Sequence, residues 1–226
     1  MRWYIMGLVL IFIITGCSTA KDSANLANLK PNNTTSEATA NPETEQPAAT
    51  QEPERKSDGK NVVVADLAQE VILLIKDKNV EDLSIFVHPD KGVRFSPYGH
   101  VDVKTDRVYT AKELSKALSD AATYNWGSFD GSGEPIDLTF EQYYDKFIYD
   151  KDFAKPTEIA YDTVIGKGNT LINYDEVYPN TKMVEYHFPQ FDKQYDGMDW
   201  ESLRLIFEEK DGAWYLVAVI HDQWTI

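Results

Sequence analysis

The sequence predicts an α+β domain in which helices come first and an antiparallel sheet closes the chain. Three observations carry this prediction. Apolar residues recur at helical spacing between residues 62 and 78, and the period shortens toward two beyond Thr157. Two alternating apolar runs then flank Asp211-Gly212, a dipeptide typical of tight β-hairpins.

The first predicted helix spans residues 62–78 and should be largely buried. Its apolar stripe holds Val64, Leu67, Ala68, Val71, Leu74 and Ile75, widened by Ile72 and Leu73. Asn79 can cap a short second helix through Phe86. A turn at 88–92 and a short strand at 93–95 follow, and Pro97 interrupts that strand.

Two capping boxes predict further helices, one beginning after Thr110 and the other after Thr139. In each, a threonine is followed three residues later by Glu or Gln, so two backbone N–H groups at the helix start gain partners. The segment from Gly127 to Pro135 is expected to be a loop between them.

The pattern in the last third of the sequence predicts strands at 158–165 and 182–188, followed by a long hairpin centred on Asp211-Gly212. With a two-residue turn and regular pairing, one face should be apolar core. The expected cross-strand pairs on that face are Phe207 with Leu216, Leu205 with Ala218, and Leu203 with Ile220.

This order of elements resembles the NTF2-like cone fold, and the segment from Phe207 to Val217 is similar to the last hairpin of many such domains. The resemblance covers residues 61–226 and implies N-terminal helices packed on a curved antiparallel sheet. The chain also resembles a class of uncharacterised bacterial surface lipoproteins that end in a His-Asp-Gln-Trp segment.

The N-terminus predicts export. Arg2 precedes an apolar run from Ile5 to Ile14, and Ile14-Thr15-Gly16-Cys17 resembles the lipobox of bacterial lipoproteins. That resemblance implies a signal peptide over 1–16 and a lipid (diacylglyceryl, with palmitate-class chains) on Cys17. The alternative is an ordinary signal or short anchor whose cysteine is incidental. Cys17 is the only cysteine, so it has no disulfide partner in the chain.

Residues 17–60 are expected to form a disordered tether. They are rich in Ser, Thr, Asn, Ala, Pro, Glu and Gln and contain no aromatic residue. A flexible coil of this length has an end-to-end distance of roughly 35 Å. The predicted location is therefore the cell membrane, with the domain held outside the cytoplasm by the lipid on Cys17.

The charge balance disfavours polyanionic partners. The chain has 22 Lys+Arg against 37 Asp+Glu, a formal net charge of −15. Residues 1–60 hold six basic and seven acidic side chains, so the excess lies in the domain. Such a domain repels nucleic-acid phosphates and anionic lipid headgroups, and nucleic acid is excluded as a partner. The charge can equally serve solubility alone.

His221 and Asp222 are the catalytic candidates. As neighbours on one strand they point to opposite faces and cannot form a dyad with each other. Asp222 is expected to follow Ile220 on the apolar face, near the mouth of a cone, where burial can raise a carboxylate pKa. The alternative is that Asp222 ends the strand, satisfied by a backbone or aromatic donor.

No metal or cofactor is predicted. The four histidines are scattered, and no two lie four residues apart on one helix. Residues 130–141 place oxygen side chains at several positions of a calcium-loop pattern, but Pro135 replaces its required glycine. A glycine-rich turn before Thr139 explains the same residues.

Trp126, Tyr144 and Trp200 are the ligand-binding candidates, because aromatic rings can stack on sugars. Aromatic side chains at helical spacing are also typical of core. The function expected is that of a binding or accessory domain of the cell envelope, with a cell-wall, small-molecule or protein ligand and no chemistry of its own. The alternative is a small NTF2-like enzyme that uses a cavity carboxylate as acid or base.

Overall fold

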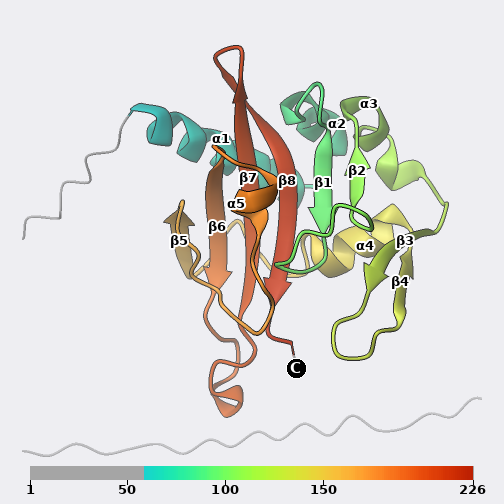
Figure 1. Cartoon of the computed structure of the whole chain (residues 1–226), viewed down its shortest axis with the longest axis vertical. Coiled ribbons are helices and arrows are strands. Elements are labelled where there is room, and N and C mark those ends of the chain that lie inside the picture. Colours follow the sequence, from blue (N-terminus) through green and yellow to red (C-terminus); the bar gives the residue numbers. More distant parts are fainter. Residues whose placement is uncertain (1–58, 226) are drawn as a thin grey trace, which may run out of the picture. The chain divides into compact units, whose positions relative to one another are not determined.

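The computed structural model describes residues 59–225. A curved, mixed six-stranded sheet has the order β2-β1-β8-β7-β6-β5, and a two-stranded ribbon pairs β3 with β4 (Figure 1). The chain is thus α+β, as the sequence predicts. The strands are β1 (Val93–Ser96), β2 (Arg107–Tyr109), β3 (Tyr124–Ser128), β4 (Pro135–Leu138), β5 (Glu158–Tyr161), β6 (Lys182–Phe188), β7 (Glu201–Lys210) and β8 (Ala213–Gln223).

Four of the helices in the described residues form where the apolar period or a cap predicts them, and the helix at Tyr174–Val177 was not predicted. The helices are α1 (Gly59–Lys76), α2 (Val80–Leu83), α3 (Ala111–Leu114), α4 (Phe140–Phe147) and α5 (Tyr174–Val177), with 3-10 turns η1 (Ser84–Phe86), η2 (Ala117–Ser119) and η3 (Lys193–Tyr195). The Asn79 side chain caps α2 by accepting a hydrogen bond from the Asp82 N–H. Both predicted capping boxes, at Thr110 and Thr139, are present. The Thr110 box starts only one turn of α-helix before η2 follows.

Three expectations need correction. The 127–135 segment is not all loop, because Gly127 and Ser128 belong to β3 and Pro135 begins β4. The strand expected at 158–165 ends at Tyr161, where Asp162 adopts a positive φ. The sheet is not wholly antiparallel, since β1 pairs in parallel with β8.

The β7–β8 hairpin turns at Asp211-Gly212 as predicted, with φ of 53° and 82°. Phe207 pairs with Leu216, but a bulge then adds one residue, Val217, to β8. Beyond the bulge Leu205 pairs with Val219 and Leu203 with His221. The predicted pairs with Ala218 and Ile220 are wrong because one extra residue moves every later side chain of β8 to the other face.

Both faces of the sheet are covered. In Figure 1, α1 and α4 lie behind the sheet and α5 lies in front of it. The main core sits behind, where the apolar stripe of α1 and aromatic residues of α4 pack on Leu203, Leu205 and Phe207. A smaller core lies in front, where Tyr174, Val177 and Tyr178 pack around Ile206, Ala218 and Ile220.

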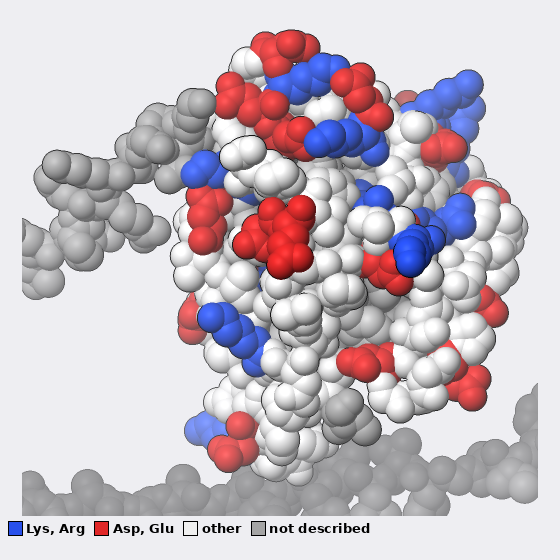
Figure 2. Space-filling view, in the orientation of Figure 1, with Lys and Arg blue, Asp and Glu red and all other residues white. Residues whose placement is uncertain are grey.

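Figure 2 shows basic side chains interspersed with acidic ones on the face that it displays, with broad uncharged areas between them. Among the described residues, no helix has both the length and the apolar character needed to cross a membrane. The predicted signal peptide, Cys17 and nearly all of the predicted tether lie outside the described residues, so those predictions stay predictions.

Candidate functional site

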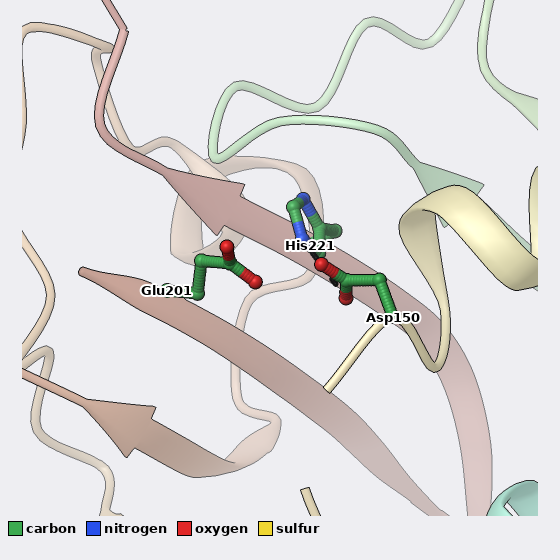
Figure 3. Close-up of side chains that lie close together, drawn as sticks. All are labelled: Asp150, Glu201 and His221. Carbon is green, nitrogen blue, oxygen red and sulfur yellow. Dashed lines mark ion pairs between the residues drawn. The ribbon is translucent and has the colours of Figure 1, made fainter. Parts of the chain in front are cut away.

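Three polar side chains converge at the end of strands β7 and β8 that lies opposite the hairpin turn. Glu201 begins β7, His221 lies near the end of β8, and Asp150 follows α4 (Figure 3). One ligand atom of each lies within 4.8 Å of the others. We call these three residues the acid–histidine cluster. It exists because the β8 bulge turns His221 to the face on which α4 packs.

His221 is held in one orientation. Its side chain is fully buried, and its ring packs edge-on against Phe147 and Phe153. The Nδ1 atom lies 3.2 Å from the carbonyl oxygen of Pro97. A carbonyl only accepts, so Nδ1 carries the hydrogen and donates. The Nε2 atom is thereby aimed at Asp150, whose Oδ1 lies 3.5 Å away.

Lys151 ties the two carboxylates together from one side. Its ammonium lies 2.9 Å from Oε1 of Glu201 and 3.3 Å from Oδ2 of Asp150. The remaining oxygens, Oδ1 of Asp150 and Oε2 of Glu201, are buried and have no hydrogen-bond partner within the described residues. Nε2 of His221 also makes no hydrogen bond, although it faces Oδ1 of Asp150 at 3.5 Å. Buried polar atoms are usually hydrogen-bonded, so the cluster has unused capacity for a further partner.

The cluster shifts the pKa values of its members. Burial, together with the neighbouring Asp150, raises the pKa of Glu201 to about 7. Burial also acts to raise the pKa of Asp150, but His221 outweighs it and the net shift is downward. For His221, burial acts to lower the pKa, and Asp150 outweighs it so that the pKa is raised. The cluster can therefore hold and release protons near neutral pH.

A hollow of about 270 Å³ opens beside the cluster. Glu201 and Lys151 line it on the cluster side, and Asp199 adds a third charged group. Its apolar lining comes from Phe191, Met198, Trp200 and Trp224. Nε1 of Trp200 and Oδ1 of Asp199 are also buried without a hydrogen-bond partner in the described part of the chain. The hollow thus combines apolar walls with unused donors and acceptors.

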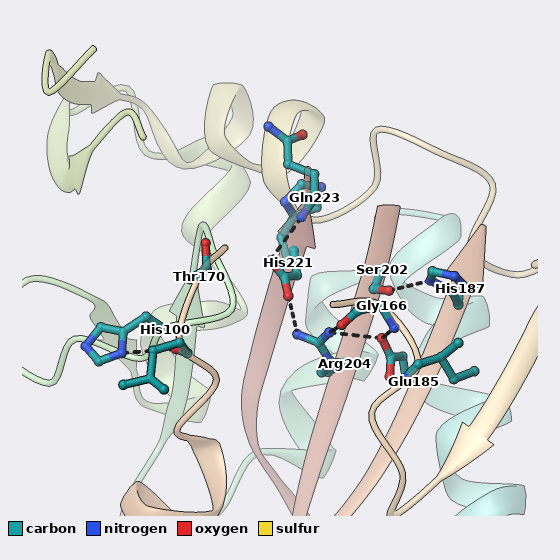
Figure 4. A network of polar contacts seen from close by, with 12 residues as sticks. His100, Gly166, Thr170, Glu185, His187, Ser202, Arg204, His221 and Gln223 are labelled. Carbon is teal, nitrogen blue, oxygen red and sulfur yellow. Dashed lines mark hydrogen bonds and ion pairs between the residues drawn. The ribbon is translucent and has the colours of Figure 1, made fainter. Parts of the chain in front are cut away.

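The front face of the sheet carries a separate network around Arg204, which is fully buried (Figure 4). Its guanidinium donates to Asp222 Oδ2 at 2.7 Å, to the Gly166 carbonyl at 2.7 Å and to Glu185 Oε1 at 3.0 Å. Glu185 also accepts from the backbone N–H groups of Ile165 and Gly166. This network fastens the 162–181 segment to the sheet, and the packing there is tight: a Cβ on Gly166 would lie 2.4 Å from Ser202 Oγ.

The structure separates the two catalytic candidates as expected, but it exchanges their faces. The prediction that Asp222 lies on the Leu203–Leu205–Phe207 face is wrong, because the β8 bulge turns it forward, where it pairs with Arg204. His221 instead lies on the face where Asp222 was expected, opposite Leu203. A regular alternation cannot reveal a bulge in advance, so the sequence placed the wrong member of the pair beside the helices.

The three aromatic candidates do not form one site. Trp126 is core, stacked on Tyr143 at 3.8 Å between ring centroids. Tyr144 is also core, and its hydroxyl donates to the carbonyl of Ile75. Trp200 lines the hollow beside Glu201. Sequence reasoning missed Asp150, Lys151 and Glu201, which have no shared spacing; the acidic residues that flank the apolar runs were the only available signal.

A larger hollow of about 440 Å³ lies between the β1–β2 connection and the β3–β4 ribbon. Its most unusual group is Asp106, whose pKa is raised to about 6 by burial. The Asp106 carboxylate accepts from the Ser96 hydroxyl and the Asp102 N–H, so its hydrogen-bonding needs are met. This hollow holds fewer unused polar groups than the one beside Glu201.

No protein-family model matches the chain, and no curated protein matches it. Among solved structures, one described as a calcium/calmodulin dependent protein kinase II association domain from Xanthomonas campestris is similar, with 13% sequence identity and a TM-score of 0.35. The similarity covers 77% of this chain and 94% of that chain. At these values it carries no function from that protein to this one.

Proposed function

We propose that this protein is a lipid-anchored accessory protein of the cell envelope whose folded domain binds a small ligand outside the cytoplasm. The observation that carries the binding role is the hollow beside Glu201, where buried polar atoms without partners meet an apolar wall. Small-molecule sites likewise combine apolar and aromatic side chains with a few polar groups that orient the ligand. We also propose that the domain is NTF2-like, on the order of its helices and its curved sheet.

The ligand would lie beside the ends of β7 and β8 and not between the helices and the sheet. In the described part of the chain that inner space is filled by aromatic core, chiefly Trp126, Phe140, Tyr143 and Phe147. Enzymatic use of a cavity carboxylate stays a prediction, and its first candidate, Asp222, is paired with Arg204. We therefore favour binding over catalysis.

A thermal-shift screen tests the binding role. The full chain, solubilised in detergent, is screened against cell-wall fragments, oligosaccharides and small amphiphiles in the presence of a chelator. A ligand at a hundred times its Kd stabilises the folded state by about 2.7 kcal/mol, which raises Tm by several degrees. Glu201→Gln should reduce that shift, whereas Glu134→Gln, the same change on an exposed loop, should leave it intact. A shift that Glu201→Gln leaves unchanged would place the ligand elsewhere.

Replacing Cys17 with alanine tests the anchor. A thiol is required for lipid attachment, and two acyl chains hold a protein stably at a membrane where one does not. We expect the Cys17→Ala protein to leave the membrane fraction and the unaltered protein to remain in it, as judged by immunoblotting of fractionated cells. Membrane retention of the alanine variant would contradict the lipobox interpretation.

A further inference from the structure

The acid–histidine cluster has the composition of a metal site, which nothing in the sequence spacing indicates. Two carboxylates and one imidazole are supplied by three different elements: the segment after α4, the start of β7 and the end of β8. Open zinc sites hold three protein ligands, drawn from His, Cys, Asp and Glu, and leave a fourth position to water. We propose that Asp150, Glu201 and His221 bind a divalent transition-metal ion of the zinc class.

The buried histidine is the strongest argument. His221 is fully buried, and its Nε2 points into the cluster, where it faces Oδ1 of Asp150 at 3.5 Å without making a hydrogen bond. Its other nitrogen donates to the Pro97 carbonyl, which fixes the tautomer and the ring. Metal-binding histidines characteristically donate their second N–H to a carbonyl or carboxylate in this way. A purely structural histidine would more commonly have both nitrogens satisfied.

The distances also suit a metal ion. Ligand atoms about 2.0–2.1 Å from a tetrahedral ion lie about 3.3 Å from one another. Nε2 of His221 and Oδ1 of Asp150 are 3.5 Å apart, and one ligand atom of each of the three residues lies within 4.8 Å of the others. Binding an ion would require the Glu201 side chain, which is 13% exposed, to move closer to the other two ligands.

Lys151 adjusts the charge of the site without occupying it. It contacts Oε1 of Glu201 and Oδ2 of Asp150 and leaves the opposite oxygens free. Metal binding displaces the protons that the cluster holds, and with both carboxylates then ionised and the histidine neutral, the four groups carry one net negative charge. That charge attracts a divalent cation. The imidazole selects for zinc-class ions, because Ca²⁺ and Mg²⁺ prefer oxygen ligands.

This inference deepens the proposed binding role, because Glu201 also lines the hollow and a metal there would have its open position facing a ligand. It nevertheless stands on its own observations. The experiments are arranged so that each can fail alone: zinc binding is measured with no organic ligand, and the organic panel is screened in the presence of a chelator.

Calorimetric titration of the chelator-treated full chain with Zn²⁺ tests the site. We expect one equivalent to bind, and Ca²⁺ not to compete at the same concentration. Glu201→Gln and His221→Gln should each weaken Zn²⁺ binding by more than about 100-fold, since loss of a ligand exceeds the 10–100-fold cost of losing an outer-shell partner. His100→Gln and Glu134→Gln, the same changes at exposed positions, should leave the affinity unaltered.

Proton competition gives a second readout. Zinc must displace the protons held by its ligands, so binding should release protons and tighten as the pH rises from 6 to 8. Because His221 is buried, its variant can lose stability, and the partly exposed Glu201 variant then decides the matter. No stoichiometric Zn²⁺ binding, or binding that Glu201→Gln leaves unchanged, would overturn the proposal.

Discussion

Replacing Arg204 with methionine is expected to lower the free energy of unfolding by about 3–5 kcal/mol at pH 7. The change removes the cation that faces Glu185 and Asp222 on the buried front side of the sheet. Methionine fills much of the arginine volume, so the loss reflects charge more than packing. Two carboxylates would be left buried without a counter-ion, a costly arrangement in a medium of low dielectric constant. Urea unfolding of both proteins, compared at equal slope, measures the difference.

The pH dependence of that loss identifies its cause. Burial already raises the pKa of Asp222 and Arg204 opposes that shift, so without Arg204 the folded-state pKa of Asp222 should rise further above its value in the unfolded chain. The folded state then binds more protons than the unfolded state, and the variant gains stability as the pH falls. The loss in free energy of unfolding caused by Arg204→Met should therefore be smaller at pH 5 than at pH 7. A deficit equal at both pH values would point to lost packing and contradict the electrostatic explanation.

A triple variant, Arg204→Met with Glu185→Gln and Asp222→Asn, is the matched control. It removes all three charges and leaves amides, of which the one at position 185 can still accept a hydrogen bond from either the Ile165 or the Gly166 N–H group. Replacing a whole buried ionic group is commonly far less costly than removing one member. The triple variant should recover a large part of the lost stability. If the triple variant recovers none of the lost stability, Arg204 stabilises the fold through its packing contacts and not by neutralising the two carboxylates.

The Arg204 network also shows what the sequence could and could not reveal. The hairpin turn, the first helix, strand β6 and both capping boxes were predictable, because each depends on residues close together in the chain. Arg204 itself stands in regular alternation between Leu203 and Leu205, so its face was clear. The partners of Arg204 could not be predicted from the sequence. They depend on strand register and on the bulge at Val217, which only the packing of the whole sheet determines.

The same limit applies to the acid–histidine cluster. Asp150, Glu201 and His221 are separated by 51 and 20 positions, with no spacing that any local motif would share. They meet because α4 ends where β7 begins and β8 finishes. The sequence indicated both His221 and Asp222 as candidate residues. The one-residue bulge in β8 determines which of the two faces α4, and that residue is His221. Trp200, chosen for its ring, does line the hollow beside the cluster.

Replacing Trp126 with alanine is expected to cost about 3–5 kcal/mol of stability, the range for deleting a large aromatic side chain from a core. The indole is fully buried and stacks on Tyr143 with an interplanar angle of 15°. Its N–H donates to the Leu138 carbonyl at 3.0 Å, which joins the core to β4. Alanine would leave a cavity and an unpaired carbonyl. Chemical denaturation of the full chain measures the loss.

Trp126→Phe separates the two contributions. A phenyl ring can keep much of the stacking on Tyr143 but cannot donate to Leu138, so its cost should be clearly smaller than that of alanine. Neither variant should alter the affinity for a ligand bound beside Glu201 as long as the protein is folded, because Trp126 does not line that hollow. If Trp126 were instead a platform for sugar stacking, alanine would abolish binding and leave stability nearly unchanged. The burial of both ring faces argues for the first outcome, since a sugar needs an open aromatic face on which to stack.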